Sequence, residues 1–402
     1  MINLLTLPKL NSKDFNDLCC CIGVDRYGIE RMILKSSVIP FKIGPLKSQA
    51  CIILKQALLA YGGEAAISSL AITETLNNLF VITLATEKQY QMAISSIRDQ
   101  QFSLQKVAHI IEKALHDLKK SVWDLKLRDG RILEIGRKPV IMGILNLTPD
   151  SFSNDGRLND FDAAISQALK MEEDGADIID IGGESTRPNA TPITAEEEWR
   201  RVEPVLVDLR KKTSLPISID TYKIEVAEKA FANGADILND ITGLRNPALR
   251  KFMADNGLPF IVMHMRGMPQ SMQSMTDYDN LLLDMHIFFE KRLEEIISSG
   301  ISINQIIIDP GIGFSKTTEQ NLTIIKGLNV FKSFGLPILV GSSRKSFIGK
   351  ITDADVDNRL AGSITSSVMA YMNGASILRV HDVKETNQAL KVAFEIVNAP
   401  LI

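Results

Sequence analysis

The sequence predicts an α/β protein built around a (βα)8 TIM barrel, which a small N-terminal α/β domain precedes. From residue 138 onward, short apolar runs alternate with segments of helical periodicity. Polar residues follow each apolar run at its carboxyl end, as is typical of parallel strands buried on both faces. Eight such βα units in about 260 residues match the size of a TIM barrel. A doubly wound open sheet is the alternative architecture.

Length and composition indicate a globular protein with room for two domains. The chain has 402 residues, of which 45% are hydrophobic, and a formal net charge of −3. This charge offers no basic surface for nucleic acid, and no apolar run reaches the roughly 20 residues that span a bilayer. Residues 1–17 are too interrupted by Pro8 and polar residues to hold the apolar core of a signal peptide. We therefore expect a cytoplasmic protein with small-molecule partners, no nucleic acid and no membrane contact.

The cysteines are not expected to carry the chemistry of this chain. All four, Cys19, Cys20, Cys21 and Cys51, occur within the first 51 residues. No nearby histidine lies at a zinc-ligand spacing, so we expect buried thiols rather than a metal site, a disulfide framework or a nucleophile.

Residues 1–130 are expected to form the small domain and residues 131–402 the barrel. The expected elements of the small domain are a helix over Ser48–Tyr61, a strand over Leu79–Ala85, and helices over Thr86–Arg98 and Ser103–Lys120. Gly62 and Gly63 indicate the end of a helix rather than an anion-binding site. The charged residues after Thr86 indicate a solvated first turn of a helix rather than a ligand site. A hairpin around Asp129 and Gly130 is expected to lead into the barrel. The small domain is thus predicted to serve packing or assembly.

The barrel strands are predicted from apolar runs bounded by turn residues. The eight runs are Val140–Leu147, Ile178–Gly182, Ile217–Asp220, Ile237–Asp240, Phe260–His264, Ile306–Asp309, Ile338–Gly341 and Ile377–His381. A last helix is expected over Lys384–Val397. The polar residues at the carboxyl ends are Asn146, Glu184, Ser185, Asp220, Asn239, Asp240, His264, Asp309, Ser342, Ser343, Arg379 and His381. Because active sites of TIM barrels lie at this end, the pattern predicts an enzyme.

Two groups of side chains indicate the kind of ligand. The first group can bind phosphate or carboxylate and comprises Arg187, Arg344, Lys345, Arg379 and His381. The second group, Asp220, Asn239 and Asp309, offers oxygen acceptors that match the N–H edge of a guanine-like or pterin-like ring. Together they predict a flat, N–H-rich heterocycle that carries a phosphate group.

Other catalytic signatures are absent or incomplete. Pro310–Lys316 resembles a dinucleotide-binding fingerprint, but Lys316 replaces its third glycine, so NAD is not expected. The sequence contains no P-loop, HExxH or GxSxG motif. His264 and His381 share no spacing that predicts a metal site.

Eight stretches of the barrel resemble dihydropteroate synthase, the pterin-binding barrel family of folate biosynthesis. They are ILNLTPDSFS (Ile144–Ser153), IDIGGESTRP (Ile179–Pro188), ISIDT (Ile217–Thr221), LND (Leu238–Asp240), MHMRGMP (Met263–Pro269), IDPGIGF (Ile308–Phe314), GSSRKSFIG (Gly341–Gly349) and RVHDVKET (Arg379–Thr386). They cover every strand end over residues 138–398, in the family's order. The resemblance implies condensation of (7,8-dihydropterin-6-yl)methyl diphosphate with 4-aminobenzoate, which gives dihydropteroate and pyrophosphate.

The same resemblance implies roles for particular residues. It assigns the aminopyrimidine edge to Asp220, Asn239 and Asp309, with Lys345 beside the ring carbonyl. Asn146 would meet Mg²⁺, and Lys345, Arg379 and His381 would be catalytic. The remaining substrate-binding residues would be Thr186 and Arg187 near the diphosphate, Phe152, Pro188 and Ser346 with Lys345 near 4-aminobenzoate, and Met263, Phe314 and Gly341. The family is commonly dimeric, so we expect a homodimer through the last helices.

The reactive groups predict a dissociative displacement. An aromatic amine is neutral near pH 7, so the main barrier is loss of diphosphate from a methylene on an electron-rich ring. Cations and Mg²⁺ would stabilise the leaving group, and the acidic pocket would tolerate positive charge on the pterin. We expect Arg379→Ala to lower turnover by ~10²–10³ while pterin binding persists.

The chain departs from the family's usual pattern in two loops. SFSNDGR (Ser151–Arg157) has Asn154 where the family has an acid and places Asp155 one residue later. The usual GFGFGK reads GIGFSK, with Ile312 and Ser315 as the departures. The small domain contains no recognisable pyrophosphokinase or aldolase motif and resembles an extension found in some longer synthases. A folate-dependent methyltransferase and a non-catalytic pterin-binding module are the alternatives.

Overall fold

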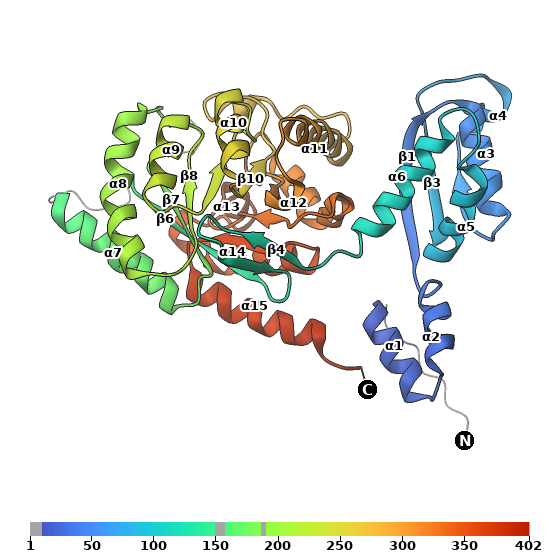
Figure 1. The fold of residues 1–402 in the computed structure, drawn as a ribbon, viewed down its shortest axis with the longest axis horizontal. Coiled ribbons are helices and arrows are strands. Elements are labelled where there is room, and N and C mark those ends of the chain that lie inside the picture. Colours follow the sequence, from blue (N-terminus) through green and yellow to red (C-terminus); the bar gives the residue numbers. More distant parts are fainter. Residues whose placement is uncertain (1–9, 149–156, 186–189, 402) are drawn as a thin grey trace. The chain divides into compact units, whose positions relative to one another are not determined.

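A computed structural model describes residues 10–148, 157–185 and 190–401. The chain divides into two units, which comprise Met1–Lys119 with Asn398–Ile402, and Lys120–Val397 (Figure 1). The expected boundary at residue 130 falls within a hairpin, and the structure groups this whole hairpin with the barrel.

The N-terminal unit contains a three-stranded antiparallel sheet, and a buried core joins this sheet to some of the helices of the unit. Its strands are β1 (Val38–Leu46), β2 (Glu64–Ala66) and β3 (Leu79–Thr86), in the order β1-β3-β2. Its helices are α1 (Ser12–Cys21), α2 (Arg26–Ile33), α3 (Ser48–Leu59), α4 (Leu70–Thr73), α5 (Glu87–Ile97) and α6 (Leu104–Asp117). The expected strand and three helices are confirmed, whereas β1, β2, α1, α2 and α4 were not predicted.

Local chemistry explains where these elements begin and end. Thr86 caps α5, because its hydroxyl accepts from the Gln89 N–H and the Gln89 side chain accepts from the Thr86 N–H at 2.7 Å. Gly62 follows α3 with φ +77°, a left-handed conformation that favours glycine. Cys19 and Cys51 are buried, but Cys20 and Cys21 are exposed because they lie on the outer face of α1. The expectation of buried thiols is therefore wrong for two of the four.

The second unit is the predicted TIM barrel. Its strands are β6 (Val140–Asn146), β7 (Ile178–Gly182), β8 (Ile217–Asp220), β9 (Ile237–Asp240), β10 (Phe260–Met263), β11 (Ile306–Asp309), β12 (Leu339–Val340) and β13 (Ile377–Val380). All pairings are parallel in the order β11-β10-β9-β8-β7-β6-β13-β12. A parallel bridge between Ile308 and Ile338 joins the two ends of this order and closes the ring. The open-sheet alternative is therefore excluded.

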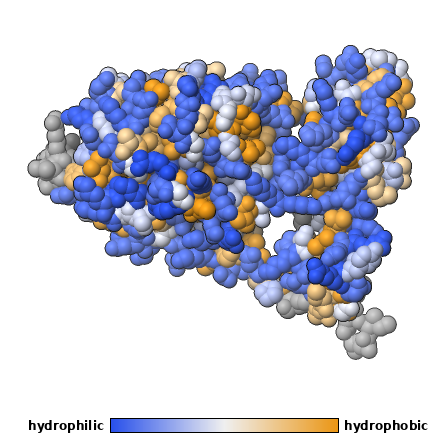
Figure 2. Space-filling model, in the orientation of Figure 1, coloured by the Kyte–Doolittle hydropathy of each residue, from blue (hydrophilic) through white to orange (hydrophobic). Residues whose placement is uncertain are grey.

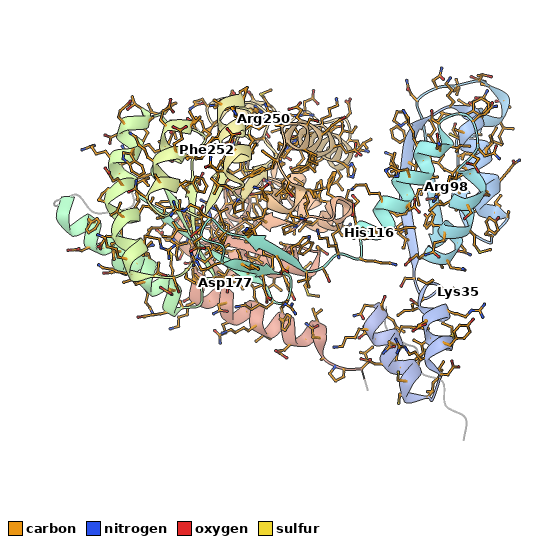
Figure 3. All side chains as sticks on the ribbon, viewed as in Figure 1. Lys35, Arg98, His116, Asp177, Arg250 and Phe252 are labelled. Atoms are coloured by element: carbon orange, nitrogen blue, oxygen red, sulfur yellow. The ribbon has the colours of Figure 1, made fainter. Side chains whose placement is uncertain are left out.

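Helices surround the strands (Figure 1). They are α7 (Arg157–Glu173), α8 (Ala195–Lys212), α9 (Ile224–Ala232), α10 (Pro247–Asn256), α11 (Leu281–Ser298), α12 (Thr318–Lys326), α13 (Ser346–Thr352), α14 (Leu360–Met372) and α15 (Val383–Asn398). Short 3-10 helices cover Met272–Ser274, Ile303–Gln305, Leu328–Phe334 and Val356–Asn358. Within this layer, Phe252 of α10, labelled in Figure 3, contacts Phe231 of α9 with ring centroids 5.9 Å apart.

Alternate residues of the strands enter two separate cores. Outward side chains such as Ile141 and Ile179 pack under the helices. Inward side chains such as Val140 and Ile178 form a core inside the ring. Polar side chains that point inward are therefore confined to the carboxyl half of the barrel, where the expected site residues lie.

A hairpin closes the amino-terminal end of the barrel. Its strands are β4 (Trp123–Lys126) and β5 (Ile132–Ile135), and Leu125, Leu127 and Ile135 join the inner core. Trp123 Nε1 donates to the carbonyl oxygen of Gly335 at 2.7 Å. The hairpin thus covers the end opposite to the expected site.

The described helices include none that is both long and apolar enough to cross a membrane. On the face shown in Figure 2, hydrophilic residues dominate and hydrophobic residues form small separate groups.

Candidate active site

Strand register brings the expected acceptors to one end of the barrel. Asp220 at the end of β8 pairs in register with Asn239 of β9. Asp309 ends β11, and all three side chains are buried, with exposures between 5% and 8%. Residues that share this inward orientation at the carboxyl ends of the strands converge on the barrel axis.

Arg379 of β13 joins these acceptors into one network. Its Nε donates to Asp180 Oδ2 at 2.6 Å, and its Nη2 donates to Asp220 Oδ2 at 2.8 Å. Asn239 Nδ2 donates to the same Asp180 oxygen at 3.1 Å. Burial opposes the charge on the guanidinium, but Asp180 and Asp220 raise the pKa of Arg379. Three strands far apart in the sequence are therefore cross-linked by one buried cation.

Asp180 is a site residue that the sequence analysis missed. It lies in the middle of β7 and is fully buried, and its Oδ1 has no hydrogen-bond partner among the described residues. Side chains two residues apart on a strand share a face, so Asp180 lies one layer below Gly182 at the strand end. An acid inside the apolar run IIDIG was the signal that could have found it.

Burial makes Asp220 and Asp309 weak acids. It raises the pKa of Asp220 to about 7, although the charge of Arg379 acts in the opposite direction. It raises the pKa of Asp309 to about 6, although Asp309 Oδ1 accepts from the Gly311 N–H at 2.7 Å. Shifted pKa values of this kind are common at functional sites, where ionisable groups are buried next to other charges.

Lys345 brings a second cation to the same pocket. Its Nζ lies 4.2 Å from the ring centroid of Phe314. Burial lowers the pKa of Lys345 to about 8, with Arg379 acting in the same direction and Asp309 and Asp220 opposing. Gly313 permits this approach, because a Cβ there would lie 3.0 Å from Lys345 Cδ.

An apolar cluster lies beside the charged groups. Its members are Ile241, Met263, Met265, Met272 and Phe314, with Tyr222 packed against them. The two hydrophobic residues expected at the site, Met263 and Phe314, both belong to it. Apolar side chains next to buried acceptors are a combination that suits a flat heterocycle with polar edges.

The expected cation group does not act as one unit. Arg344, which has φ +57°, pairs with Asp382 and donates from Nε to Oδ2 at 3.1 Å. His381 Nδ1 lies 3.1 Å from Ser343 Oγ, and burial lowers the pKa of His381 to about 3, so its ring is neutral at pH 7. Of the described residues in this group, Arg379 and Lys345 are the ones that face the acceptor network.

Several polar residues at strand ends have structural partners. Asp240 accepts from the Thr242 N–H and hydroxyl and from the Leu244 N–H, and thereby shapes the loop after β9. Glu184 pairs with Lys223 and accepts from the Tyr222 hydroxyl at 3.0 Å. These residues shape the rim rather than line the acceptor network.

The other expected residues fall into two sets. Asn146 is half-buried at the end of β6, Gly341 lies against Arg379, and Ser346 is exposed at the start of α13. The second set lies outside the described residues and comprises Phe152, Asn154, Asp155, Thr186, Arg187 and Pro188.

Known proteins share this barrel. The model of the pterin binding enzyme family matches residues 142–381. Dihydropteroate synthase of Synechocystis is 47% identical over 264 residues, which cover 65% of this chain and 91% of that protein. Dihydropteroate synthase of Escherichia coli K12 is 43% identical over 254 residues, which cover 63% of this chain and 90% of that protein.

Solved structures agree with the sequence matches. Dihydropteroate synthase of Xanthomonas albilineans with 4-aminobenzoic acid superposes with a TM-score of 0.66 at 41% identity, and the match covers 69% of this chain and 100% of that one. The same enzyme in complex with 7,8-dihydropteroate gives a TM-score of 0.63 at 38% identity, again over 69% of this chain and 100% of that one.

The chain belongs to the pterin binding enzyme family, and its barrel spans the family's matched region. It is an enzyme and a transferase. Its activity is that of a dihydropteroate synthase.

Proposed function

We propose that the carboxyl-end pocket condenses (7,8-dihydropterin-6-yl)methyl diphosphate with 4-aminobenzoate, with particular residues in the following roles. The observation that carries this assignment is the network of Arg379, Asp180, Asp220 and Asn239, whose charges also act on Asp309 and Lys345 at the same end of the barrel. The pocket combines buried acceptors, a caged guanidinium and an apolar wall.

The acceptors bind the aminopyrimidine edge of the pterin. Asp220 and Asp309 are buried carboxylates whose raised pKa values reflect the cost of burial. A ligand that donates N–H groups offsets this cost, and a carboxylate can accept two parallel N–H bonds. Asn239 donates one amide N–H to Asp180, and this orients its side-chain oxygen as the acceptor for the ring.

Lys345 and Phe314 bind the ring from another side. The Lys345 ammonium lies over the Phe314 ring, near the charges of Asp309 and Asp220. From there it donates to the ring carbonyl, while Phe314 and Met263 contact the ring atoms. Ser346, at the exposed start of α13, contacts 4-aminobenzoate in this proposal, and Phe152 and Pro188, which lie outside the described residues, are assigned to the same substrate.

Arg379 and His381 bind around the diphosphate with Thr186 and Arg187. Arg379 uses Nε and Nη2 on the acids, and its Nη1 has no hydrogen bond to a described residue. The neutral imidazole of His381 can donate one N–H to a phosphate oxygen.

The residues at the end of β6 fit a Mg²⁺ ion that is held jointly with the substrate. Asn146 supplies an amide oxygen beside Gly182, where a Cβ would lie 3.7 Å from Asn146 Oδ1. The described residues contain no group of three or more acids, histidines or cysteines that could hold a metal by themselves. This suits Mg²⁺, which takes one or two protein ligands and completes its shell with phosphate oxygens and water. When bound, the ion neutralises charge on the departing diphosphate.

The displacement is dissociative. The bond from the pterin methylene to the diphosphate oxygen breaks with its electron pair on oxygen, and the amine nitrogen forms the new bond to carbon and then loses one proton. Asp220 and Asp309 tolerate the positive charge that develops on the pterin, and the charge of Arg379 favours the ionised form of Asp220 against the effect of burial. Preorganised charges of this kind supply much of the catalysis in enzymes.

The test is release of pyrophosphate from the pterin diphosphate in the presence of Mg²⁺, with and without 4-aminobenzoate. We expect release that depends on the arylamine. Methyl transfer to a corrinoid protein would support the methyltransferase alternative, and pterin binding without release would support the non-catalytic module.

Arg379→Ala should lower turnover by ~10²–10³, because it removes a preorganised cation. The sequence alone led us to expect that pterin binding would persist, but Arg379 pairs with Asp180 and Asp220, so we now expect weaker pterin binding as well. Arg98→Ala, at an exposed arginine on the N-terminal unit (Figure 3), is the control. Unchanged turnover in Arg379→Ala would reject the assignment.

We also propose a homodimer and a cytoplasmic site of action. Exposed apolar residues on the last helices favour self-association, and they are Leu360, Met369 and Met372 on α14 and Val392, Ile396 and Val397 on α15. The four cysteines are free, as is typical of a reducing compartment. Sedimentation equilibrium should give twice the chain mass. The N-terminal unit is proposed as a packing or assembly domain.

A further inference from the structure

Lys316 is a buried lysine whose ammonium is surrounded by acceptors. Lys316 is only 4% exposed to solvent. Its Nζ lies 2.8 Å from the carbonyl oxygen of Phe314, 3.0 Å from that of Gly311 and 3.3 Å from that of His264. It also lies 3.0 Å from His264 Nδ1. Burial lowers the pKa of His264 to about 2, so its neutral ring can accept this bond.

These bonds join the loop after β11 to the end of β10. His264 follows β10, whereas Gly311 and Phe314 belong to the loop that leads to α12. The two segments approach so closely that a Cβ on Gly311, which has φ +67°, would lie 2.2 Å from the carbonyl oxygen of His264. The loop is therefore held against β10 by one ammonium group.

Ser315 adds a second connection to the same place. It replaces the family's usual glycine and has φ +51°, a conformation that costs a residue with a side chain about 1 kcal/mol. Its hydroxyl accepts from the Arg266 N–H at 3.0 Å and donates to the Phe314 carbonyl oxygen at 2.7 Å. The Tyr278 hydroxyl donates to the Ser315 carbonyl oxygen at 3.2 Å. These bonds offset the backbone cost and extend the connection into the loop after β10.

The connected loop contacts Asp309 and carries Phe314, the two groups that are proposed to bind the pterin on this side. Gly311, whose carbonyl oxygen accepts from Lys316, donates its N–H to Asp309 Oδ1 at 2.7 Å. Phe314, whose carbonyl oxygen accepts from both Ser315 and Lys316, has its ring under the Lys345 ammonium. One side of the pocket therefore depends on the Ser315–Lys316 pair.

We propose that Ser315 and Lys316 are positioning residues that set Asp309 and Phe314 for the pterin and thereby determine the affinity for the pterin diphosphate. This inference rests on the proposed roles of Asp309 and Phe314. Neither residue of the pair needs to contact substrate, since Lys316 is enclosed by protein atoms. Loss of either connection lets the loop move away from β10, which misplaces an acceptor and a ring at once.

The test compares Lys316→Met with Ser315→Gly and Ser315→Ala in the full chain. Lys326→Met is the matched control, because Lys326 lies exposed in the last turn of α12. We would measure kcat, the KM for each substrate, and the Kd of 6-hydroxymethylpterin, which lacks the leaving group. We expect Lys316→Met to raise the pterin KM and Kd about tenfold, because the variant loses the several hydrogen bonds that the buried amino group donates. The KM for the arylamine substrate should stay unchanged.

The two serine variants distinguish the effect of the hydroxyl group from the effect of the backbone conformation. Ser315→Gly removes the hydroxyl, and glycine adopts φ +51° without strain. We therefore expect a rise of about threefold in the pterin KM. Ser315→Ala should raise it further, because it loses the bonds and keeps the backbone cost. A lower melting temperature with both KM values unchanged would show a purely structural role and overturn the proposal.

Ser315→Gly decides the question if Lys316→Met does not fold, and an unchanged pterin KM in that variant would overturn the proposal. Asp309→Asn distinguishes this failure from failure of the proposed pocket. If Asp309→Asn does not weaken binding of 6-hydroxymethylpterin, the assignment of the pocket itself is wrong. If it does weaken binding while the Ser315 and Lys316 variants bind normally, only the positioning role is wrong.

Discussion

Buried carboxylates at the carboxyl ends of the barrel strands reduce the folding stability at neutral pH, and in the proposed function they bind the pterin. Asp309 is 7% exposed, and burial raises its pKa to about 6. A raised pKa means that the folded state holds a proton more tightly than the unfolded state does. The contribution of Asp309 to stability is therefore complete at pH values below about 4 and is lost as the pH rises through about 6.

Asp309→Asn should accordingly stabilise the barrel at pH 8. The amide removes the buried charge, and its oxygen can still accept from the Gly311 N–H. We expect a gain of about 1 to 3 kcal/mol in the free energy of unfolding, measured by urea denaturation. The same variant should bind 6-hydroxymethylpterin far more weakly, because the amide has an NH2 donor in place of one carboxylate oxygen and cannot accept two parallel N–H bonds.

The pH dependence of this gain is its control. At pH 4, where Asp309 is protonated in the folded protein, the variant and the parent should have similar stability. Asp255→Asn, at an exposed acid on α10, should change stability little at either pH. A loss of stability at pH 8 would contradict the idea that the carboxylate is costly there.

Pterin affinity should itself vary with pH. The acceptors must be ionised to bind N–H groups, and the pKa values are raised to about 7 for Asp220 and about 6 for Asp309. Affinity should therefore fall as the pH drops below 7. Above pH 8 it should fall again, because the pKa of Lys345 is lowered to about 8 and its charge is then lost. Calorimetric Kd values for 6-hydroxymethylpterin between pH 5 and 9 check this, and a flat profile would contradict it.

Among the elements, the barrel strands were predictable because each has a strong local signal. Short apolar runs that end in polar residues define β7, β8, β9 and β11 with the bounds that the structure has. The partners of the polar residues were not predictable. The pairing of Arg379 with Asp180 joins residues far apart in the sequence and depends on the inward orientation of both side chains.

Strand β1 shows why other elements were missed. It contains Pro40, Gly44 and Pro45, which interrupt the alternating pattern that identifies a strand. The structure tolerates these prolines because β1 lies at the edge of the sheet order β1-β3-β2. Strand β2 has three residues, too few for a periodic signal. Position in the sheet, which the local sequence does not contain, explains the first case, and strand length explains the second.

The β4–β5 hairpin should stabilise the barrel without taking part in its chemistry. Leu125 is 2% exposed and packs on inward residues at the amino-terminal end of the strands. Leu125→Ala should therefore reduce the free energy of unfolding by about 2 to 5 kcal/mol, measured by urea denaturation. The kcat and both KM values of the folded variant should be unchanged.

The neighbouring Asp124 offers a matched control. Its side chain lies on the opposite, exposed face of β4, so Asp124→Ala should change stability by less than about 0.5 kcal/mol. A selective rise of one KM in folded Leu125→Ala would show that the hairpin affects the site at the other end of the barrel.

At the scale of the whole molecule, the two units have separate cores. The core of the N-terminal unit draws its residues from Leu46 to Leu115, and the barrel cores begin at Leu125. The described residues with expected or observed roles in the site all lie between Asn146 and His381. The matched family region, residues 142–381, also lies within the barrel unit.

A chain that begins at Lys120 should therefore fold and keep the kcat and both KM values of the full chain. It retains the hairpin, so the inward residues Val140 and Met142 stay covered. A chain that begins at Lys138 is the control. It lacks the hairpin and exposes those residues, so it should aggregate or unfold although every site residue is present. If the Lys120 fragment folds but loses activity, the N-terminal unit must contribute to catalysis or to the assembly that catalysis requires. Circular dichroism and the pyrophosphate assay on the same samples separate loss of folding from loss of function.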